Sequence, residues 1–312
     1  MFRLSALALI SFASFAADPA LLKLLPPSAT VVAGIDVERA KDSPFGQYVL
    51  TQWHNDDKGF SEFITLTGFD PRRDLREVMF ASLPQAAHHN GAFVAKGTFD
   101  VSKFLSAAAS KGAVNSIYQG ANIIAKPNDS GWVAFLDGST VIGGDAESVK
   151  AAIGRRQSGT GSLPPVVTAK IADLQNRYDA WIHTVTPGAT VQESLNGPNG
   201  LQVNGEVLRG IQTASGGVKF GSNIRLGAEA IARSDRDAVA LQDVVKFLAG
   251  MVQLNREKPD AADAAGILEN LEITTKANLV TLSLEIPQAQ AEKFFENRKQ
   301  VKPRARRSRA VI

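Results

Sequence analysis

Two short clusters of histidine and acidic residues carry side chains that could bind a divalent metal. His54, Asp56 and Asp57 lie within the stretch HNDD. Imidazole nitrogens and carboxylate oxygens are common ligands of such ions, but neighbouring side chains on one loop seldom converge on a single ion. His88 and His89 are adjacent, so they lack the spacing that places two histidines on one face of a helix. We therefore expect no metal site and no cofactor.

The sequence predicts a charged loop at residues 70–76. Together with Glu77, this loop offers either acid–base or anion-binding chemistry. Three acidic residues alternate with three basic ones: Asp70, Arg72, Arg73, Asp74, Arg76 and Glu77. Opposite charges this close together are expected to neutralise one another rather than to raise the pKa of a carboxyl group. We expect ion pairs on a surface loop, and Arg72, Arg73 and Arg76 are our candidates for an anion-binding site.

Three further positions invite a catalytic interpretation. His183 shares one face of a predicted strand, residues 179–185, with Trp181 and Val185, and a carboxylate there could make it a general base. A structural histidine with satisfied hydrogen bonds is the ordinary alternative. Ser215-Gly216-Gly217 lacks the Gly-x-Ser-x-Gly elbow, and residues 159–162 lack the lysine and helix of a phosphate-binding loop. We expect turns at both places and assign no catalytic residue.

The composition removes several classes of protein. The chain has 312 residues and no cysteine, so disulfides, thiolate metal sites, iron–sulfur clusters and cysteine nucleophiles are excluded. The three Trp and three Tyr are scattered along the chain and form no stacking platform for single-stranded nucleic acid. Stability must come from burial of the hydrophobic residues, which make up 44% of the chain.

The N-terminus has the pattern of a secretory signal peptide. Arg3 precedes an uncharged apolar run from Leu4 to Phe15, which is too short to span a membrane, and small residues follow at Ala16 and Ala17. We predict cleavage after Ala16 or Ala17, which defines residues 1–17 as the signal peptide. No second membrane segment follows, so we expect an exported protein, periplasmic or extracellular.

The C-terminal residues 298–312 carry a concentrated positive charge. Seven basic residues and no acidic ones occur there: Arg298, Lys299, Lys302, Arg304, Arg306, Arg307 and Arg309. Without these seven and Arg3, 26 basic residues remain against 31 acidic ones, so a basic nucleic-acid-binding domain is not supported. We predict a disordered tail that either aids solubility or contacts anionic lipid or nucleic acid through Arg304, Arg306, Arg307 and Arg309.

The hydrophobic pattern predicts an α+β fold of mixed or mostly antiparallel sheets, with helices packed on one face. Asp100, Asp145 and Ser234 are placed to cap helices, and Asp137-Gly138 is a strong hairpin signal. The Gly- and Pro-containing stretch 156–165 is the predicted linker between domains at 18–155 and 166–297. Both domains contain strand, capped helix, antiparallel strands and helix in the same order, which suggests two similar halves.

Two segments resemble uncharacterised exported bacterial proteins classed as domains of unknown function. Residues 24–36 (LLPPSATVVAGID) match their start, in which leucine and proline precede a hydrophobic strand that ends in Asp. Residues 227–253 (GAEAIARSDRDAVALQDVVKFLAGMVQ) have a similar strand and helix. The resemblance implies an exported α+β protein and transfers no functional residue.

Together these observations favour a non-catalytic exported protein that binds a partner or organises the cell envelope. One alternative is a secreted or periplasmic hydrolase whose site is assembled from distant residues, with His183 and the 70–77 region as its nearest candidates. The other alternative is a tether, in which the basic tail holds the protein on anionic lipid or nucleic acid. The partner, an envelope protein or an anionic surface, stays open.

Overall fold

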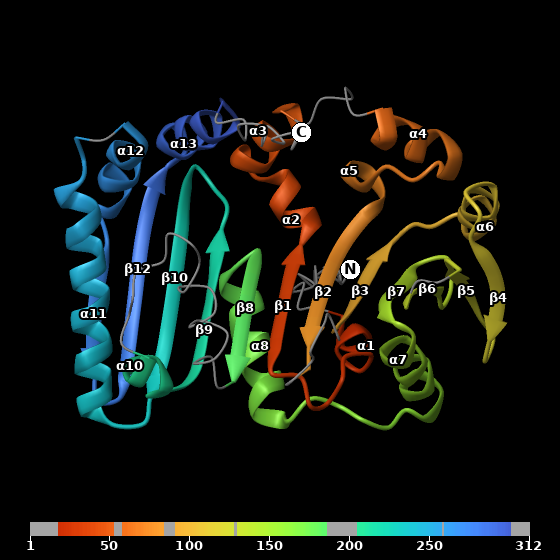
Figure 1. Cartoon of the computed structure of the whole chain (residues 1–312), viewed down its shortest axis with the longest axis horizontal. Coiled ribbons are helices and arrows are strands. Elements are labelled where there is room, and N and C mark those ends of the chain that lie inside the picture. The colour runs from red at the N-terminus through yellow and green to blue at the C-terminus, as the bar shows by residue number, and fades with distance from the viewer. Residues whose placement is uncertain are drawn as a thin grey trace, which may run out of the picture.

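All strands of the described residues join one antiparallel sheet. The computed structural model describes residues 18–52, 58–83, 91–127, 130–185, 205–257 and 259–300. Their twelve strands lie in the order β11-β12-β10-β9-β8-β1-β2-β3-β7-β6-β5-β4 (Figure 1). Every pairing between neighbours is antiparallel. The predicted α+β class and the mostly antiparallel sheet are therefore confirmed.

The sheet is built from two consecutive sets of strands. The first set is β1 Val31–Asp36, β2 Leu75–Ser82, β3 Gly91–Gly97, β4 Val114–Tyr118, β5 Ala121–Ala125, β6 Gly131–Phe135 and β7 Thr140–Asp145. The second set is β8 Ala180–Val185, β9 Ile211–Lys219, β10 Asn223–Ala232, β11 Glu272–Lys276 and β12 Leu279–Pro287. In each set, three strands pair in sequence and a helical segment follows, after which the last strand of the set returns beside the third.

Several helices begin at a residue whose side chain caps them. They are α1 Pro19–Leu22, α2 Val37–Asp42, α3 Pro44–Gln52, α4 Lys58–Thr67, α5 Pro71–Asp74, α6 Val101–Ser110, α7 Ala146–Ser158, α8 Pro165–Arg177, α10 Gly205–Arg209, α11 Asp235–Leu254, α12 Pro259–Leu268 and α13 Gln288–Gln300. The side chains of Asp100, Asp145 and Ser234 accept hydrogen bonds from backbone N–H groups of the first turn, as predicted. Such a cap satisfies a donor that has no partner inside the helix.

Two side chains on β8 define the two faces of the sheet. Residues that are paired across antiparallel strands lie on the same face, so the register assigns each face along the whole sheet. We call one the Trp181 face, which includes Val32, Met79, Val94, Ile142 and Ala134. We call the other the Ile182 face, which includes Ala33, Phe80, Phe93, Gly216 and Ala228.

Helices cover both faces, not one face as predicted. On the Trp181 face, α7 and α8 pack against β1 to β7 in the largest buried cluster, which includes Met79, Ile142 and Ile153. On the Ile182 face, Phe104 of α6 packs with Phe135 and other phenylalanines at one end of the sheet. At the other end, α11 covers β10 and β12 of the same face.

The two sets of strands meet where β1 pairs with β8. Val32 lies opposite His183, and Gly34 lies opposite Trp181. A Cβ atom on Gly34 would lie 2.5 Å from the Trp181 ring, so a glycine is needed for the indole to rest on β1. The sheet is continuous across this junction, and α7 continues into the predicted linker as far as Ser158. The division into separate domains at residues 18–155 and 166–297 stays a prediction.

Three local predictions are wrong. The hydrophobic pattern predicts a helix over residues 208–214, but α10 ends at Arg209 and β9 begins at Ile211. Ser215-Gly216-Gly217 lies within β9 rather than in a turn. The predicted tail begins at Arg298, whereas α13 continues to Gln300. Glycine and serine are tolerated inside β9 because β8 and β10 pair with it on both sides.

Candidate functional site

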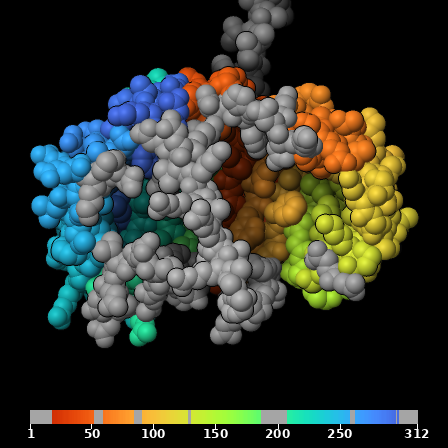
Figure 2. Space-filling view, turned by 45° about the horizontal axis from the view of Figure 1, so that its top comes forward, coloured from red at the N-terminus to blue at the C-terminus, as the bar shows by residue number. Residues whose placement is uncertain are grey.

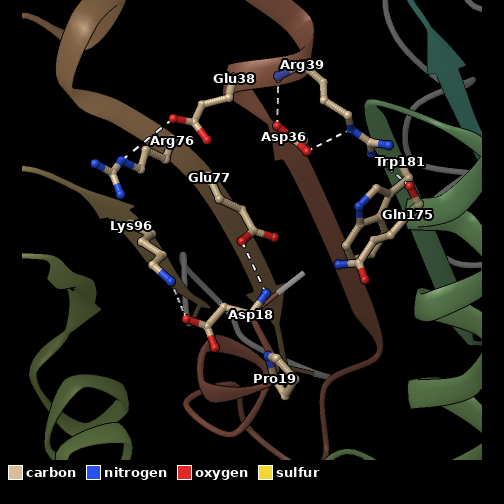
Figure 3. A pocket seen from close by; sticks show the side chains of 10 residues that line it. All are labelled: Asp18, Pro19, Asp36, Glu38, Arg39, Arg76, Glu77, Lys96, Gln175 and Trp181. Atoms are coloured by element: carbon tan, nitrogen blue, oxygen red, sulfur yellow. Dashed lines mark hydrogen bonds and ion pairs between the residues drawn. The ribbon is translucent and has the colours of Figure 1, made fainter. Parts of the chain in front are cut away.

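A polar cavity opens on the Trp181 face beside the end of β1 and the start of β2 (Figure 3). Its volume is about 290 Å³. Its lining is rich in charged groups: Asp18, Pro19, Asp36, Glu38, Arg39, Arg76, Glu77, Lys96, Gln175 and Trp181. We call it the acidic cavity, because four of these side chains are carboxylates.

The strand register places the acidic residues of this cavity together. Asp36 is the last residue of the apolar strand β1, and Glu77 comes two residues after β2 begins. Antiparallel pairing sets Asp36 opposite Glu77, which in turn lies opposite Lys96 of β3. Sequence reasoning missed this cavity. The available signal was an acid that closes one apolar strand and another that opens the next, because antiparallel neighbours bring such ends together.

Asp36 and Arg39 neutralise each other at one side of the cavity. Asp36 accepts hydrogen bonds from the backbone N–H and the Nε of Arg39, at 2.9 and 2.7 Å. Arg39 Nη2 also donates to the carbonyl oxygens of Gln175 and Tyr178, at 2.8 and 3.0 Å. Arg39 therefore connects α2, which follows β1, to the C-terminal end of α8. This role is structural, since most of its donors are engaged.

Glu77 differs from its neighbours because it has no cationic partner within ion-pair distance among the described residues. Its Oε2 lies 3.5 Å from the backbone nitrogen of Asp18, which donates to it. Lys96 pairs instead with the Asp18 carboxylate. Burial is the largest influence on the Glu77 carboxyl and raises its pKa. The hydrogen bond from the Asp18 N–H lowers it and the charge of Asp36 raises it further, and the pKa that results is about 7. Glu77 is thus a half-buried acid that is partly protonated near neutral pH.

A second cavity, of about 520 Å³, lies on the Ile182 face over β8, β9, β10 and β12. None of the described residues that line it is charged: Ala180, Trp181, Ile182, Gly216, Gly217, Val218, Leu226, Gly227, Ala228, Leu271, Leu282, Ser283 and Leu284. We call it the apolar hollow. In Figure 2 the middle of the sheet lies deeper than the two rims formed by α11 to α13 and by α4 and α6.

Small residues make the floor of the apolar hollow. Gly216 lies between Ile182 on β8 and Ala228 on β10. The side chain of Ile182 is 46% exposed, although a strand centre is normally a place where such a residue is covered. Gly216, Ala180 and Ala228 leave the space that larger side chains would fill. The alternating pattern of these strands was visible in the sequence, but which part of the sheet the described helices leave uncovered was not.

The three candidate arginines are all ion-paired. Arg72 lies 2.7 Å from Asp70 and Arg73 lies 2.7 Å from Asp74, and these hydrogen bonds lower the pKa of both carboxyl groups. Arg76 lies 3.7 Å from Glu38 on α2. The expected ion pairs are present, with a turn of helix α5 and the start of β2 in place of a loop. Anion binding by these arginines stays a prediction.

His183 lies on the predicted face of β8 and is hydrogen-bonded to a serine. Its Nδ1 lies 2.9 Å from Ser215 Oγ, and the two residues are 6% and 7% exposed. Burial, followed by the charge of Lys170, lowers the pKa of His183. The pair has the contact of a nucleophile and its base, but a substrate could not reach the hydroxyl. Because His183 does not line the acidic cavity, the hydrolase alternative rests on Glu77 alone.

Several sequence predictions fall outside the described residues. They are the signal peptide at residues 1–17, the histidines at 54, 88 and 89, and the tail arginines Arg304, Arg306, Arg307 and Arg309. Across the described ranges, no three His, Asp or Glu side chains are grouped so that they could hold a metal ion. Among the helices of that same part of the chain, none has the length and apolar character needed to cross a bilayer.

Comparison with known proteins identifies relatives of the fold. No protein-family model matches the chain, and no curated protein matches its sequence. The solved structure of crystal form I of TP0453 is similar at a TM-score of 0.52 and 10% identity, over 91% of this chain and 99% of that one. Crystal form III of TP0453 gives a TM-score of 0.54 and 11% identity, over 88% and 97% of the two chains. At this identity the similarity concerns the fold alone.

Proposed function

We propose that the protein is an exported, non-catalytic binding protein that takes an uncharged apolar molecule into the apolar hollow. The observation that carries this proposal is a cavity of about 520 Å³ whose lining, in the part of the chain that the structure describes, is uncharged and mostly apolar. Ligand sites in proteins are commonly cavities of roughly 300–1,000 Å³ with mainly hydrophobic walls. Export is supported by the signal-peptide pattern of residues 1–17.

The chemistry of the lining selects the ligand class. Leu226, Leu282 and Leu284 offer aliphatic contacts. Ser283 also lines the hollow, but its side chain lies on the opposite face of β12. A charged group placed there would lose its hydration without gaining an ion pair, which is unfavourable. A hydrocarbon chain or an uncharged ring system would instead remove apolar surface from water on both partners. The ligand is therefore expected to be apolar where it contacts the sheet.

A fluorescence titration with the uncharged probe N-phenyl-1-naphthylamine tests the proposal. We expect saturable binding with one site per chain. Ala228→Phe should weaken binding at least tenfold by filling the hollow, and Ile182→Lys should do the same by placing a charge on its floor. Both positions are exposed on the sheet face, so folding should be preserved and is checked by circular dichroism.

The matched control is Ile117→Lys on β4. Ile117 is also an exposed aliphatic strand residue, 75% accessible, but it lies at the far end of the sheet from the hollow. This variant should bind the probe as the unsubstituted chain does. Equal loss in all three variants would point to nonspecific adsorption and would contradict the proposed site.

A further inference from the structure

The backbone nitrogen of Asp18 lies beside a carboxyl group of the sheet. It lies 3.5 Å from Glu77 Oε2, at the mouth of the acidic cavity, on the Trp181 face (Figure 3). The Asp18 carboxylate caps α1 by accepting a hydrogen bond from Ala20 N at 2.9 Å, and it pairs with Lys96. These contacts fix the backbone of Asp18 beside Glu77.

The sequence predicts that the chain is cut within one residue of this position. The apolar run of residues 4–15 and the small residues Ala16 and Ala17 predict cleavage just before Asp18 or one residue earlier. Hydrolysis of the Ala17–Asp18 peptide bond consumes one water and leaves a carboxylate on Ala17 and an amine on Asp18, which takes up a proton to become an ammonium group. The charge of the group beside Glu77 therefore depends on whether the leader has been removed.

We propose that removal of residues 1–17 creates an N-terminal ammonium group on Asp18 that forms an ion pair with Glu77 and locks the start of the mature chain to the sheet. This inference uses the proposed export only for the cleavage itself and does not involve the apolar hollow.

The charges around Glu77 make it a suitable partner for an added cation. Asp36 on β1 is already paired with Arg39, and Lys96 on β3 is paired with Asp18. At the rim, Arg76 is paired with Glu38. Glu77 is the carboxylate of the cavity left without a cation among the described residues. A half-buried carboxylate in this state is costly when ionised, and an ammonium group at hydrogen-bond distance removes that cost.

The ion pair removes the loss of stability that Glu77 would otherwise cause as the pH rises. With an amide at Asp18, the pKa of Glu77 is about 7, above its ordinary value of 4.5. The folded chain then holds this proton more tightly than the unfolded chain, so the stabilisation is present below pH 4.5 and is lost as the pH rises through 7. An ammonium partner lowers the pKa of Glu77, so the mature chain should keep its stability across that window.

Cleavage after Ala16 would move the ammonium group by one residue. It would leave an amide at Asp18, and the ammonium group would be carried by the preceding residue. Direct pairing at the observed distance therefore requires cleavage after Ala17, which is one of the two sites that the sequence predicts. Intact mass and N-terminal sequencing of the exported protein distinguish the two sites, and a start at any residue other than Asp18 would overturn the proposal.

Titration of the α-amino group gives the direct test. In the exported chain we expect it to titrate above about 9, compared with roughly 7.7–8.0 for a free α-amine, and to react slowly with acylating reagents at pH 7. Glu77→Gln should restore the ordinary value and the fast reaction. An ordinary titration in the unsubstituted exported chain would show that the amine is free, and the pairing would be wrong.

Thermal unfolding at pH 7.5 gives an independent test. It compares the effect of the same substitution in two forms of the chain, so a difference in stability between the two forms does not invalidate it. The comparison form carries Gly-Ser inserted between Ala17 and Asp18, which moves the ammonium group away by up to about 7 Å and restores an amide at Asp18. Glu77→Gln should lower the melting temperature of the exported chain by about 3 °C or more. In the inserted form, Glu77→Gln should leave the melting temperature unchanged or raise it. Effects of equal size and sign in the two forms would overturn the pairing.

The control substitution is Glu62→Gln. Glu62 forms an exposed ion pair with Lys111 at 2.6 Å and lies outside the acidic cavity, so it should behave alike in both forms. Failure of the pairing would leave probe binding by the apolar hollow untouched. Failure of export would be recognised separately, because the mass spectrum would show a chain that still carries residues 1–17.

Discussion

The two halves of the sheet are covered differently. Strands β1 to β7 have a buried cluster on each face, one under α7 and α8 and the other under α4 and α6. Strands β10 to β12 are packed under α11 and α13 on the Ile182 face. On their Trp181 face, β12 and β11 carry Thr281, Ser283, Glu285, Glu272 and Thr274. A strand covered on both sides needs a continuous apolar sequence, whereas a strand covered on one side needs an alternating one.

The largest expected difference between the halves is in the free energy of unfolding that is lost when a side chain on the Trp181 face is shortened. Met79→Ala, at a side chain that is 0% exposed, should lower the free energy of unfolding by about 3 kcal/mol, because it leaves a cavity in a packed cluster. Ser283→Ala, on the same face of β12, should change it by less than about 0.5 kcal/mol. Chemical denaturation of both variants measures the difference.

A comparable loss from both variants would contradict the comparison. It would mean that the Trp181 face of β12 is covered in the folded protein. A small loss from Met79→Ala alone would mean that the cluster under α7 and α8 relaxes around the missing side chain.

This contrast could be predicted from the sequence only in part. The strand LVTLSLEI alternates after Val280, so its single covered face was readable. The strand EVMFASL has no polar residue between Val78 and Ala81, yet Phe80 is 44% exposed, so the cover on its second face was not readable. Capped helices at Asp100, Asp145 and Ser234 were also readable, since each cap is a local contact. The register that brings Asp36 to Glu77 was not, because it depends on pairing across about forty residues of intervening chain.

A second contrast concerns the hairpin turns of the two halves. In the first half, Asp137 closes the β6–β7 turn by accepting from the N–H and Oγ of Ser139 and from Arg156 on α7. Burial alone would raise the pKa of Asp137, but these hydrogen bonds outweigh it and lower the pKa to about 2. In the second half, Asn278 in the β11–β12 turn donates to the Ala232 carbonyl oxygen at 3.0 Å.

Asp137→Asn should therefore destabilise the protein in a pH-dependent way. The stabilisation by Asp137 is present above its unfolded pKa of 3.8 and is lost as the pH falls toward 2. Because Asp137 and Arg156 are 39% and 43% exposed, screening by solvent leaves an expected loss of about 1 kcal/mol at pH 7. Unfolding of the two chains between pH 2 and pH 7 should show this difference shrinking at low pH.

Asn278→Ala is the control for that measurement. Its amide does not titrate, so its cost should be the same at pH 7 and at pH 3. A pH-independent cost for Asp137→Asn would show that its hydrogen bonds stabilise the turn without any contribution from charge.

The smallest expected effect comes from backbone conformation at the same turn of the second half. Ala277 has a φ of 51°, in the left-handed region that favours glycine. Ala277→Gly should raise the free energy of unfolding by about 0.5 kcal/mol, since it relieves this strain at the cost of a more flexible unfolded chain.

Gly120 in the β4–β5 turn of the first half is the matched position. It has a φ of 82°, and a Cβ atom added there would have no described atom within 4 Å. Gly120→Ala therefore tests the backbone effect alone and should destabilise by about 1 kcal/mol. Denaturation curves of both variants should shift in opposite directions. A shift in the same direction would mean that contacts outside the turns decide the outcome.

The junction of the two halves also determines the order in which the sheet can be completed. Val31 of β1 pairs with Thr184 of β8, almost half the chain later. During synthesis, β1 can pair with β2 early, but its other edge has no native partner until β8 has emerged. Contacts of such large sequence separation fold slowly, and an unpaired strand edge invites association with other chains. The strand β1, which lies in the middle of the finished sheet, is thus an exposed edge during folding. A chaperone that delays collapse would protect this edge from association with other chains.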